Sequence, residues 1–171
     1  EGGALIINDD SLVEKARYLI NFGIENQESI PELGTNAKMN EFEAAMGLCV
    51  LDDIDQVIQK RKIIYRRYEQ ELEGAVGFQE KNKAATLNYG YLPIIMQDEV
   101  QRLKVEENLN QKNIFPRRYF YPSLDTLNYI EPKQSSAISR DISRRILALP
   151  LYPELDKSSQ KTIINVVKEV L

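Results

Sequence analysis

Leu33-Gly34-Thr35-Asn36-Ala37-Lys38-Met39-Asn40-Glu41-Phe42 joins a polar loop to the start of a long amphipathic helix. The Asn40 side chain is placed to cap that helix, and Glu43 follows three residues later, as in a capping box. Apolar residues then recur at helical spacing as far as Gly74: Phe42, Met46, Val50, Ile54, Val57, Ile64, Tyr68 and Leu72. A helix of about 33 residues is about 50 Å long, a length typical of a helix that links two domains or lines a subunit interface.

The loop ahead of this helix carries two groups suited to an anion. Asn36 offers amide N–H donors, and Lys38 offers an ammonium group. Because the N-terminal end of a helix attracts negative charge, the sequence predicts that Asn36 and Lys38 hold a phosphate there.

The remaining elements alternate between strand and helix. In the first part we expect a strand over residues 3–8, a helix capped by Asp9, Asp10 and Ser11 that ends at Gly23, and an irregular segment over 24–38. After Gly77 the patterns predict strands over 86–96 and 114–119, helices over 100–112, 136–146 and 158–171, and a short apolar segment over 147–151. These elements form an α/β sandwich of roughly 95 residues.

Composition narrows the chemistry. The 171 residues carry a net charge of −4 and are 43% apolar and 28% charged, so we expect a globular protein that does not bind nucleic acid. The sequence contains no histidine, which removes the usual general base and the commonest zinc ligand, and we predict no metal site. No apolar run approaches the roughly 20 residues that cross a bilayer, and we expect no membrane association. The lone Cys49, interpreted as a packing residue, favours a cytoplasmic protein.

A second candidate site is Arg117-Arg118-Tyr119-Phe120-Tyr121-Pro122. Two guanidinium groups followed by aromatic rings are suited to a phosphate and a flat ring. An edge strand with outward arginines and inward aromatic residues explains the same pattern without a ligand. We interpret Leu147-Ala148-Leu149-Pro150-Leu151-Tyr152-Pro153 as a structural crossing fixed by its prolines.

Taken in order, these motifs resemble the DegT-type sugar-nucleotide aminotransferases. The resemblance begins with Glu1-Gly2-Gly3-Ala4, Asn21-Phe22-Gly23, the Leu33–Met39 loop, and Glu41 with Ala44-Ala45-Met46-Gly47, and it continues through 117–122 and 149–152. It implies the C-terminal part of an aspartate aminotransferase fold (fold type I). Residues 1–38 would be the end of the large cofactor domain, 39–74 the connecting helix, and 75–171 a small α/β domain.

The resemblance also implies an activity. Members of this family are homodimers that use pyridoxal phosphate to move an amino group from glutamate to a nucleotide-linked keto sugar, for deoxyamino sugars of surface polysaccharides or glycosylated products. Asn36 would reach the cofactor phosphate of the neighbouring subunit, with Lys38 in support. Arg117, Arg118, Tyr119 and Tyr121 would face the sugar nucleotide, which the form of this motif indicates is a dTDP-deoxyhexose that reacts at the 3- or 4-position.

In the family, the lysine that forms the internal aldimine lies a few residues before the position of Glu1. We therefore expect no catalytic residue in this chain, and we expect that the chain alone neither binds pyridoxal phosphate tightly nor is active. Two alternatives remain open. One is a dehydrase of the same family, in which histidine replaces that lysine; the other is a non-catalytic dimerising module with the long helix at its interface.

Overall fold

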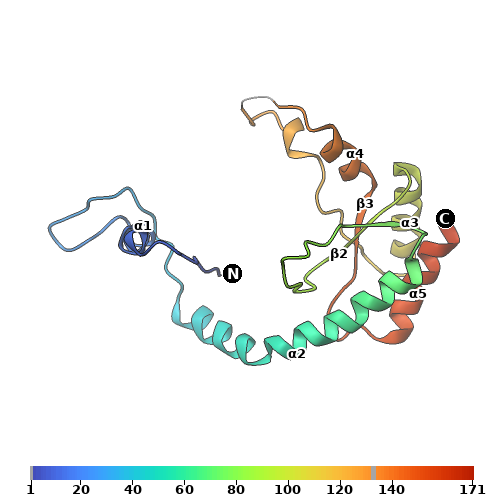
Figure 1. The fold of residues 1–171 in the computed structure, drawn as a ribbon, viewed down its shortest axis with the longest axis horizontal. Coiled ribbons are helices and arrows are strands. Elements are labelled where there is room, and N and C mark those ends of the chain that lie inside the picture. The colour runs from blue at the N-terminus through green and yellow to red at the C-terminus, as the bar shows by residue number, and fades with distance from the viewer. Residues whose placement is uncertain (1, 132–133) are drawn as a thin grey trace. The chain divides into compact units, whose positions relative to one another are not determined.

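The computed structural model describes residues 2–131 and 134–171, so Glu1 of the first motif lies outside the described residues. The chain forms two units, Glu1–Ile54 and Asp55–Leu171. The elements of the chain, labelled in Figure 1 where there is room, are η1 (Asp10–Leu12), α1 (Val13–Ile20), α2 (Glu41–Leu72), β1 (Gly77–Phe78), β2 (Leu92–Ile95), α3 (Glu99–Asn110), η2 (Leu124–Thr126), α4 (Ala137–Arg145), β3 (Ile146–Leu149) and α5 (Lys157–Val170).

Helix α2 begins and ends where the sequence predicts. The backbone N–H of Glu43 donates to Asn40 Oδ1 at 2.9 Å, and the N–H of Asn40 donates to Glu43 Oε2 at 3.1 Å, which completes the capping box. Its 32 residues give a length of about 48 Å. Gly74, with φ +74°, adopts the left-handed conformation that terminates many helices.

In the first unit, η1 and α1 form the predicted helical segment, and the Asp9 carboxylate caps its start by accepting the Ser11 N–H at 3.0 Å. The strand predicted over residues 3–8 is wrong. A strand needs a neighbour for its backbone groups, and no described residue pairs with this segment. The interpretation of Cys49 as a packing residue is also wrong, because Cys49 is exposed, as are Met46 and Val50 beside it.

The second unit contains a three-stranded antiparallel sheet in the order β1-β2-β3. Pro93 of β2 lies opposite Ala148 of β3. The N–H and C=O of Ala148 bond instead to the backbone of Arg117, at 2.7 and 3.0 Å. Pro93 has no N–H to donate, and Ala148 is bonded on its other side, so this pair leaves no backbone N–H of these two residues unpaired.

The hydrophobic core belongs to this second unit. Its buried residues come from the C-terminal half of α2, from β2 and the residue after it, from β3, and from α3, α5 and the segment before α5: Ile64, Tyr65, Tyr68, Leu72, Leu92, Ile94, Met96, Val105, Leu109, Leu147, Leu149, Leu155, Ile163, Ile164, Val166 and Val167. Two buried polar groups make long-range hydrogen bonds to the backbone. Gln160 is buried and donates to the Ile64 carbonyl at 2.7 Å, and Tyr68 donates to the Pro150 carbonyl at 3.2 Å.

Helices α3, α4 and α5 confirm the three helices predicted in this unit. None of the helices among the described residues combines the length and apolarity needed to span a membrane.

The strands of the second unit are shorter than predicted. The predicted strand over 86–96 is reduced to β2, because Tyr89 has a left-handed backbone, φ +52°, that interrupts an extended chain. The predicted strand over 114–119 is reduced to the bridge between Arg117 and Ala148, since Pro116 cannot donate to a strand ladder. The apolar segment over 147–151 instead contributes most of β3.

Candidate functional site

The Leu33–Met39 loop of the first unit is fixed against the end of α1. The Thr35 N–H donates to the Leu19 carbonyl at 2.9 Å, the Phe22 N–H donates to the Thr35 carbonyl at 3.0 Å, and the Ala37 N–H donates to the Ile20 carbonyl at 2.9 Å. These bonds flank an antiparallel bridge between Asn21 and Asn36. Two motifs that lie apart in the sequence are therefore one structural element.

Two glycines permit this close approach. Gly23 has φ +79°, and a Cβ there would lie 1.7 Å from the Glu32 carbonyl oxygen. A Cβ on Gly34 would lie 2.2 Å from the Gly23 nitrogen. Both obstacles are backbone atoms, so neither position accepts a side chain without separation of the two segments.

The two predicted cofactor ligands differ in their surroundings. The Asn36 side chain is exposed, on backbone held by the bridge to Asn21. The Lys38 Nζ donates to Asn21 Oδ1 at 2.9 Å and lies 4.5 Å from the centroid of the Phe22 ring. Lys38 is thus oriented by the same turn that holds Asn36. Both residues lie on the loop segment that is held against the end of α1.

The adjacent end of α2 is less suited to an anion than the sequence suggests. Its first turn carries the carboxylates of Glu41 and Glu43, and the N–H of Glu43 already bonds to Asn40. Negative side chains in this position use the favourable potential of the helix end. An anion at this loop would depend on Asn36 and Lys38 rather than on the helix.

In the second unit, Arg117 and Tyr119 line a cleft of about 300 Å³ beside β3. Arg117 extends from the bridge to Ala148 and has an exposed side chain. The Tyr119 ring packs edge-to-face on Tyr91, with 5.4 Å between centroids and an interplanar angle of 86°. Phe115 and Tyr152 complete the aromatic lining. The cleft therefore combines one guanidinium group with three tyrosine rings and one phenylalanine ring.

Arg118 and Tyr121 form a separate pair that does not line this cleft. Arg118 Nη2 donates to Glu99 Oε1 at 3.0 Å, and the guanidinium group lies 3.5 Å from the centroid of the Tyr121 ring. A further contact joins Arg118 to the carbonyl of Arg144 at 3.5 Å. These contacts hold the 117–122 segment against the start of α3 and the end of α4. The structure divides the four predicted substrate residues into two groups.

Sequence reasoning missed three aromatic residues of the cleft. Tyr91 and Phe115 lie in segments predicted as strands, and Tyr152 lies in the segment interpreted as a structural crossing. Tyr152 is in fact 46% exposed. Its position between Pro150 and Pro153, which favour an irregular exposed segment, was the signal that could have identified it.

Within residues 2–131 and 134–171, no cluster of three or more histidine, cysteine, aspartate or glutamate side chains is arranged to hold a metal ion. The polar groups that converge in these two regions are amide, ammonium, guanidinium and phenol groups. Such donors bind phosphate and carboxylate oxygens, and the rings accept flat ligands.

Comparison with known proteins gives a consistent match along the chain. The profile of the DegT/DnrJ/EryC1/StrS aminotransferase family matches residues 1–168. A dTDP-4-amino-4,6-dideoxy-D-glucose transaminase of Escherichia coli is 32% identical over 180 residues, which cover 100% of this chain and 48% of the relative. A GDP-perosamine synthase of Escherichia coli O157:H7 is 26% identical, over 99% of this chain and 47% of the relative.

Solved structures agree with the fold. The crystal structure of S. venezuelae DesV superposes with a TM-score of 0.85 at 20% identity, over 96% of this chain and 45% of that protein. The structure therefore confirms an α/β arrangement that forms part of an aminotransferase fold. The chain spans about half the length of the curated relatives it matches.

Proposed function

The chain belongs to the DegT/DnrJ/EryC1/StrS aminotransferase family, and from this premise we propose that it is the C-terminal part of a sugar-nucleotide aminotransferase. The enzyme transfers an amino group from glutamate to a keto-deoxyhexose on a nucleoside diphosphate. The observation that carries the proposal is the 32% identity to a dTDP-sugar transaminase along the whole chain. In this proposal residues 1–38 are the last part of the cofactor domain, 39–74 form the helix that connects the two domains, and 75–171 form the small domain.

The Leu33–Met39 loop fits the phosphate of pyridoxal phosphate. The exposed amide of Asn36 supplies one donor, and the Lys38 ammonium keeps two N–H groups beyond the one that it gives to Asn21. We place this phosphate in the partner subunit of a homodimer. When bound, the cofactor supplies the electron sink for amino-group transfer. The role of Asn36 and Lys38 is to hold and orient its phosphate.

The cleft beside β3 is suited to the nucleotide sugar. Arg117 presents an exposed guanidinium group, which can make two parallel hydrogen bonds to a phosphate. Tyr119 supplies a ring and a phenol group for the sugar. Arg118 and Tyr121 position Arg117 and Tyr119 indirectly, because their contacts hold the 117–122 segment in place. The names of the relatives include both dTDP and GDP sugars, and we favour dTDP from the identity of 32% against 26%.

Because the chain spans about half of its relatives, we propose that the reaction needs the preceding half of such an enzyme and that the chain alone does not transaminate. The lone cysteine favours a reducing, cytoplasmic setting.

The test uses the polypeptide extended upstream of Glu1 to the length of its relatives. After incubation with pyridoxal phosphate and reduction with borohydride, peptide mass mapping should find a phosphopyridoxyl group on a lysine shortly before Glu1. In a separate sample that has not been reduced, glutamate and a dTDP-keto-deoxyhexose should yield 2-oxoglutarate. If the position held a histidine and the sugar lost a hydroxyl group, the protein would be a dehydrase instead. If the position held neither lysine nor histidine, the remaining interpretation would be a non-catalytic interaction module. Transamination by the 171-residue chain alone would refute its proposed inactivity.

The cofactor role of Asn36 is tested by Asn36→Asp in the same polypeptide. A carboxylate beside a phosphate should weaken cofactor binding by about tenfold or more, because a donor is lost and a like charge is added. Asn8→Asp is the matched control, since Asn8 is another exposed asparagine of the first unit. Equal cofactor affinity in both variants, measured by absorbance titration, would exclude Asn36 from the phosphate site.

A further inference from the structure

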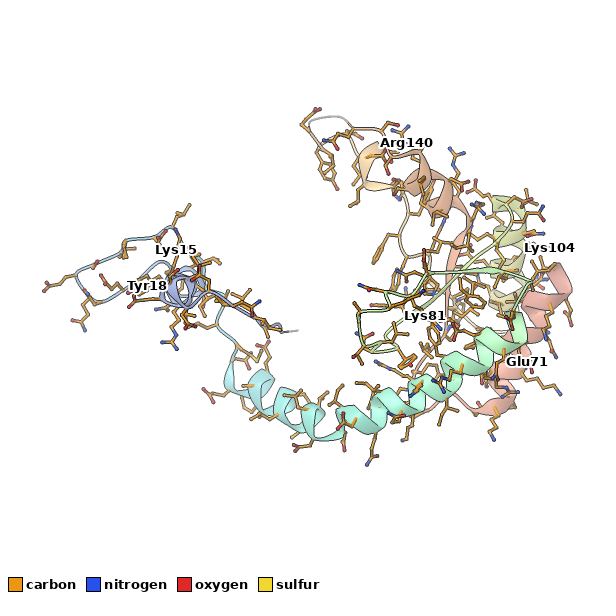
Figure 2. All side chains as sticks on the ribbon, viewed as in Figure 1. Lys15, Tyr18, Glu71, Lys81, Lys104 and Arg140 are labelled. Atoms are coloured by element: carbon orange, nitrogen blue, oxygen red, sulfur yellow. The ribbon has the colours of Figure 1, made fainter. Side chains whose placement is uncertain are left out.

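The segment between β1 and β2 forms a second cleft that adjoins the first. Its volume is about 310 Å³, and Tyr65, Lys81, Asn82, Asn88 and Tyr89 contribute to its walls. Gly90 and Tyr91 line both this cleft and the cleft of Arg117 and Tyr119. The two clefts are therefore neighbouring compartments separated by one short stretch of chain. Lys81, labelled in Figure 2, marks the segment.

Tyr89 is held in an unusual conformation at this boundary. Its φ of +52° is rare for a residue with a bulky side chain, and such residues concentrate at binding sites. Asn88 supports the turn, since its Oδ1 accepts the Gly90 N–H at 2.9 Å. The Tyr89 ring packs edge-to-face on Tyr65, with centroids 5.3 Å apart. Tyr65 is 7% exposed, so it provides a rigid support for the more exposed ring.

The lining of this compartment carries one cation, Lys81, which is paired, and the carboxylate of Glu80. Lys81 Nζ lies 2.5 Å from Glu69 Oε1 and 5.4 Å from the centroid of the Tyr65 ring. The oxygens of Asn82 and Asn88 accept backbone N–H groups at 2.9 Å, which leaves their NH₂ groups as donors. A cavity with aromatic walls, amide donors, a neutralised cation and the carboxylate of Glu80 is suited to a flat, neutral, polar ring rather than to a phosphate, which the carboxylate would repel.

We propose that the compartment of Tyr65, Lys81, Asn82, Asn88 and Tyr89 receives the nucleobase of the substrate, while Arg117 in the adjoining cleft holds its diphosphate. This inference rests on the proposed function, and it assigns the two ends of the nucleotide to separate compartments. The Tyr89 ring supplies the stacking surface, and the amides of Asn82 and Asn88 meet the polar edge of the base. The left-handed turn places Tyr89 directly before Gly90 and Tyr91, the two residues that both clefts share.

The test measures binding to the full-length protein loaded with pyridoxal phosphate, by isothermal titration calorimetry. The probes are dTDP, GDP and inorganic pyrophosphate. Tyr89→Leu should lower the affinity for the preferred nucleoside diphosphate by about tenfold or more, the effect expected for loss of one stacking ring. Tyr89→Phe keeps the ring and should stay within about threefold of the unaltered protein. Pyrophosphate affinity should be unchanged in both variants.

Tyr129→Leu is the matched control, because Tyr129 is 78% exposed and lines neither cleft. Unchanged nucleotide affinity in Tyr89→Leu would overturn the inference and leave the proposed function intact. An equal loss of pyrophosphate binding would also overturn it, because the effect would then not be specific to the base. If the unaltered protein bound none of the probes, both the inference and the proposed function would fall.

Discussion

Replacement of Gly34 by alanine tests whether the loop that carries Asn36 depends on backbone contact. The new Cβ would lie 2.2 Å from the Gly23 nitrogen and 2.7 Å from the Leu19 carbonyl oxygen. Atoms this close must separate, and separation breaks the three backbone hydrogen bonds that join the loop to the end of α1. At about 0.5 to 1.5 kcal/mol for each bond, the local loss is about 1.5 to 4.5 kcal/mol.

Hydrogen exchange measures this loss directly. The amides of Phe22, Thr35 and Ala37 donate the three bonds, so in Gly34→Ala they should exchange about ten to a thousand times faster, since 1.4 kcal/mol corresponds to a factor of ten. The cofactor affinity of the full-length protein should fall with them. Gly47→Ala is the control, because a Cβ at Gly47 meets no atom within 4 Å. Unchanged protection of the three amides in Gly34→Ala would refute the reasoning.

Two other predictions separate binding from stability. Arg117→Ala should raise KM for the nucleotide sugar by about tenfold or more, with little change in the free energy of unfolding. Arg118→Ala should instead lower the free energy of unfolding by about 1 kcal/mol, because it removes a partly exposed ion pair and a ring contact. Urea titration and kinetics on both variants check this, and reversed effects would contradict it. Hydrogen bonds from Ser123, the Ser136 N–H and Arg140 lower the pKa of Asp125 to about 2. The Asp125 carboxylate therefore stabilises the fold above about pH 4, the usual aspartate pKa, and this contribution is lost as the pH falls toward about 2. Acid titration of Asp125→Asn should show a flatter loss of stability over that range, and an unchanged profile would contradict the assignment.

The capped helix and the family motifs could be predicted because their signals are local. Asn40 and Glu43 lie three residues apart, so their reciprocal bonds follow from spacing alone. Gly74 likewise ends α2 at the expected place. The strand limits could not be predicted in this way. Tyr89 adopts a left-handed backbone that its residue type disfavours, and only its contacts with Tyr65 and the turn at Asn88 account for it.

The candidate site was predicted as a set of residues but not as a geometry. The sequence places Arg117 and Arg118 side by side, yet one lines a cleft and the other is bonded to Glu99. The side chains of adjacent residues on an extended segment point in opposite directions, so only one of the two arginines can line the cleft. Which one leaves depends on the bridge between Arg117 and Ala148, a contact between positions 31 residues apart. Such a contact has no signature in a single sequence.

The burial of residues along helix α2 also could not be predicted from the sequence alone. Its apolar residues keep one period along its whole length, and by this criterion Phe42 and Met46 should be buried as fully as Tyr68 and Leu72. Phe42 is 89% and Met46 65% exposed, whereas Tyr68 and Leu72 are fully buried. Periodicity identifies the apolar face of the helix, but whether that face is buried depends on which other segments pack against it. Residues of the second unit cover the C-terminal part of that face. For the N-terminal part, the pattern alone predicts that burial requires contacts beyond those among the described residues.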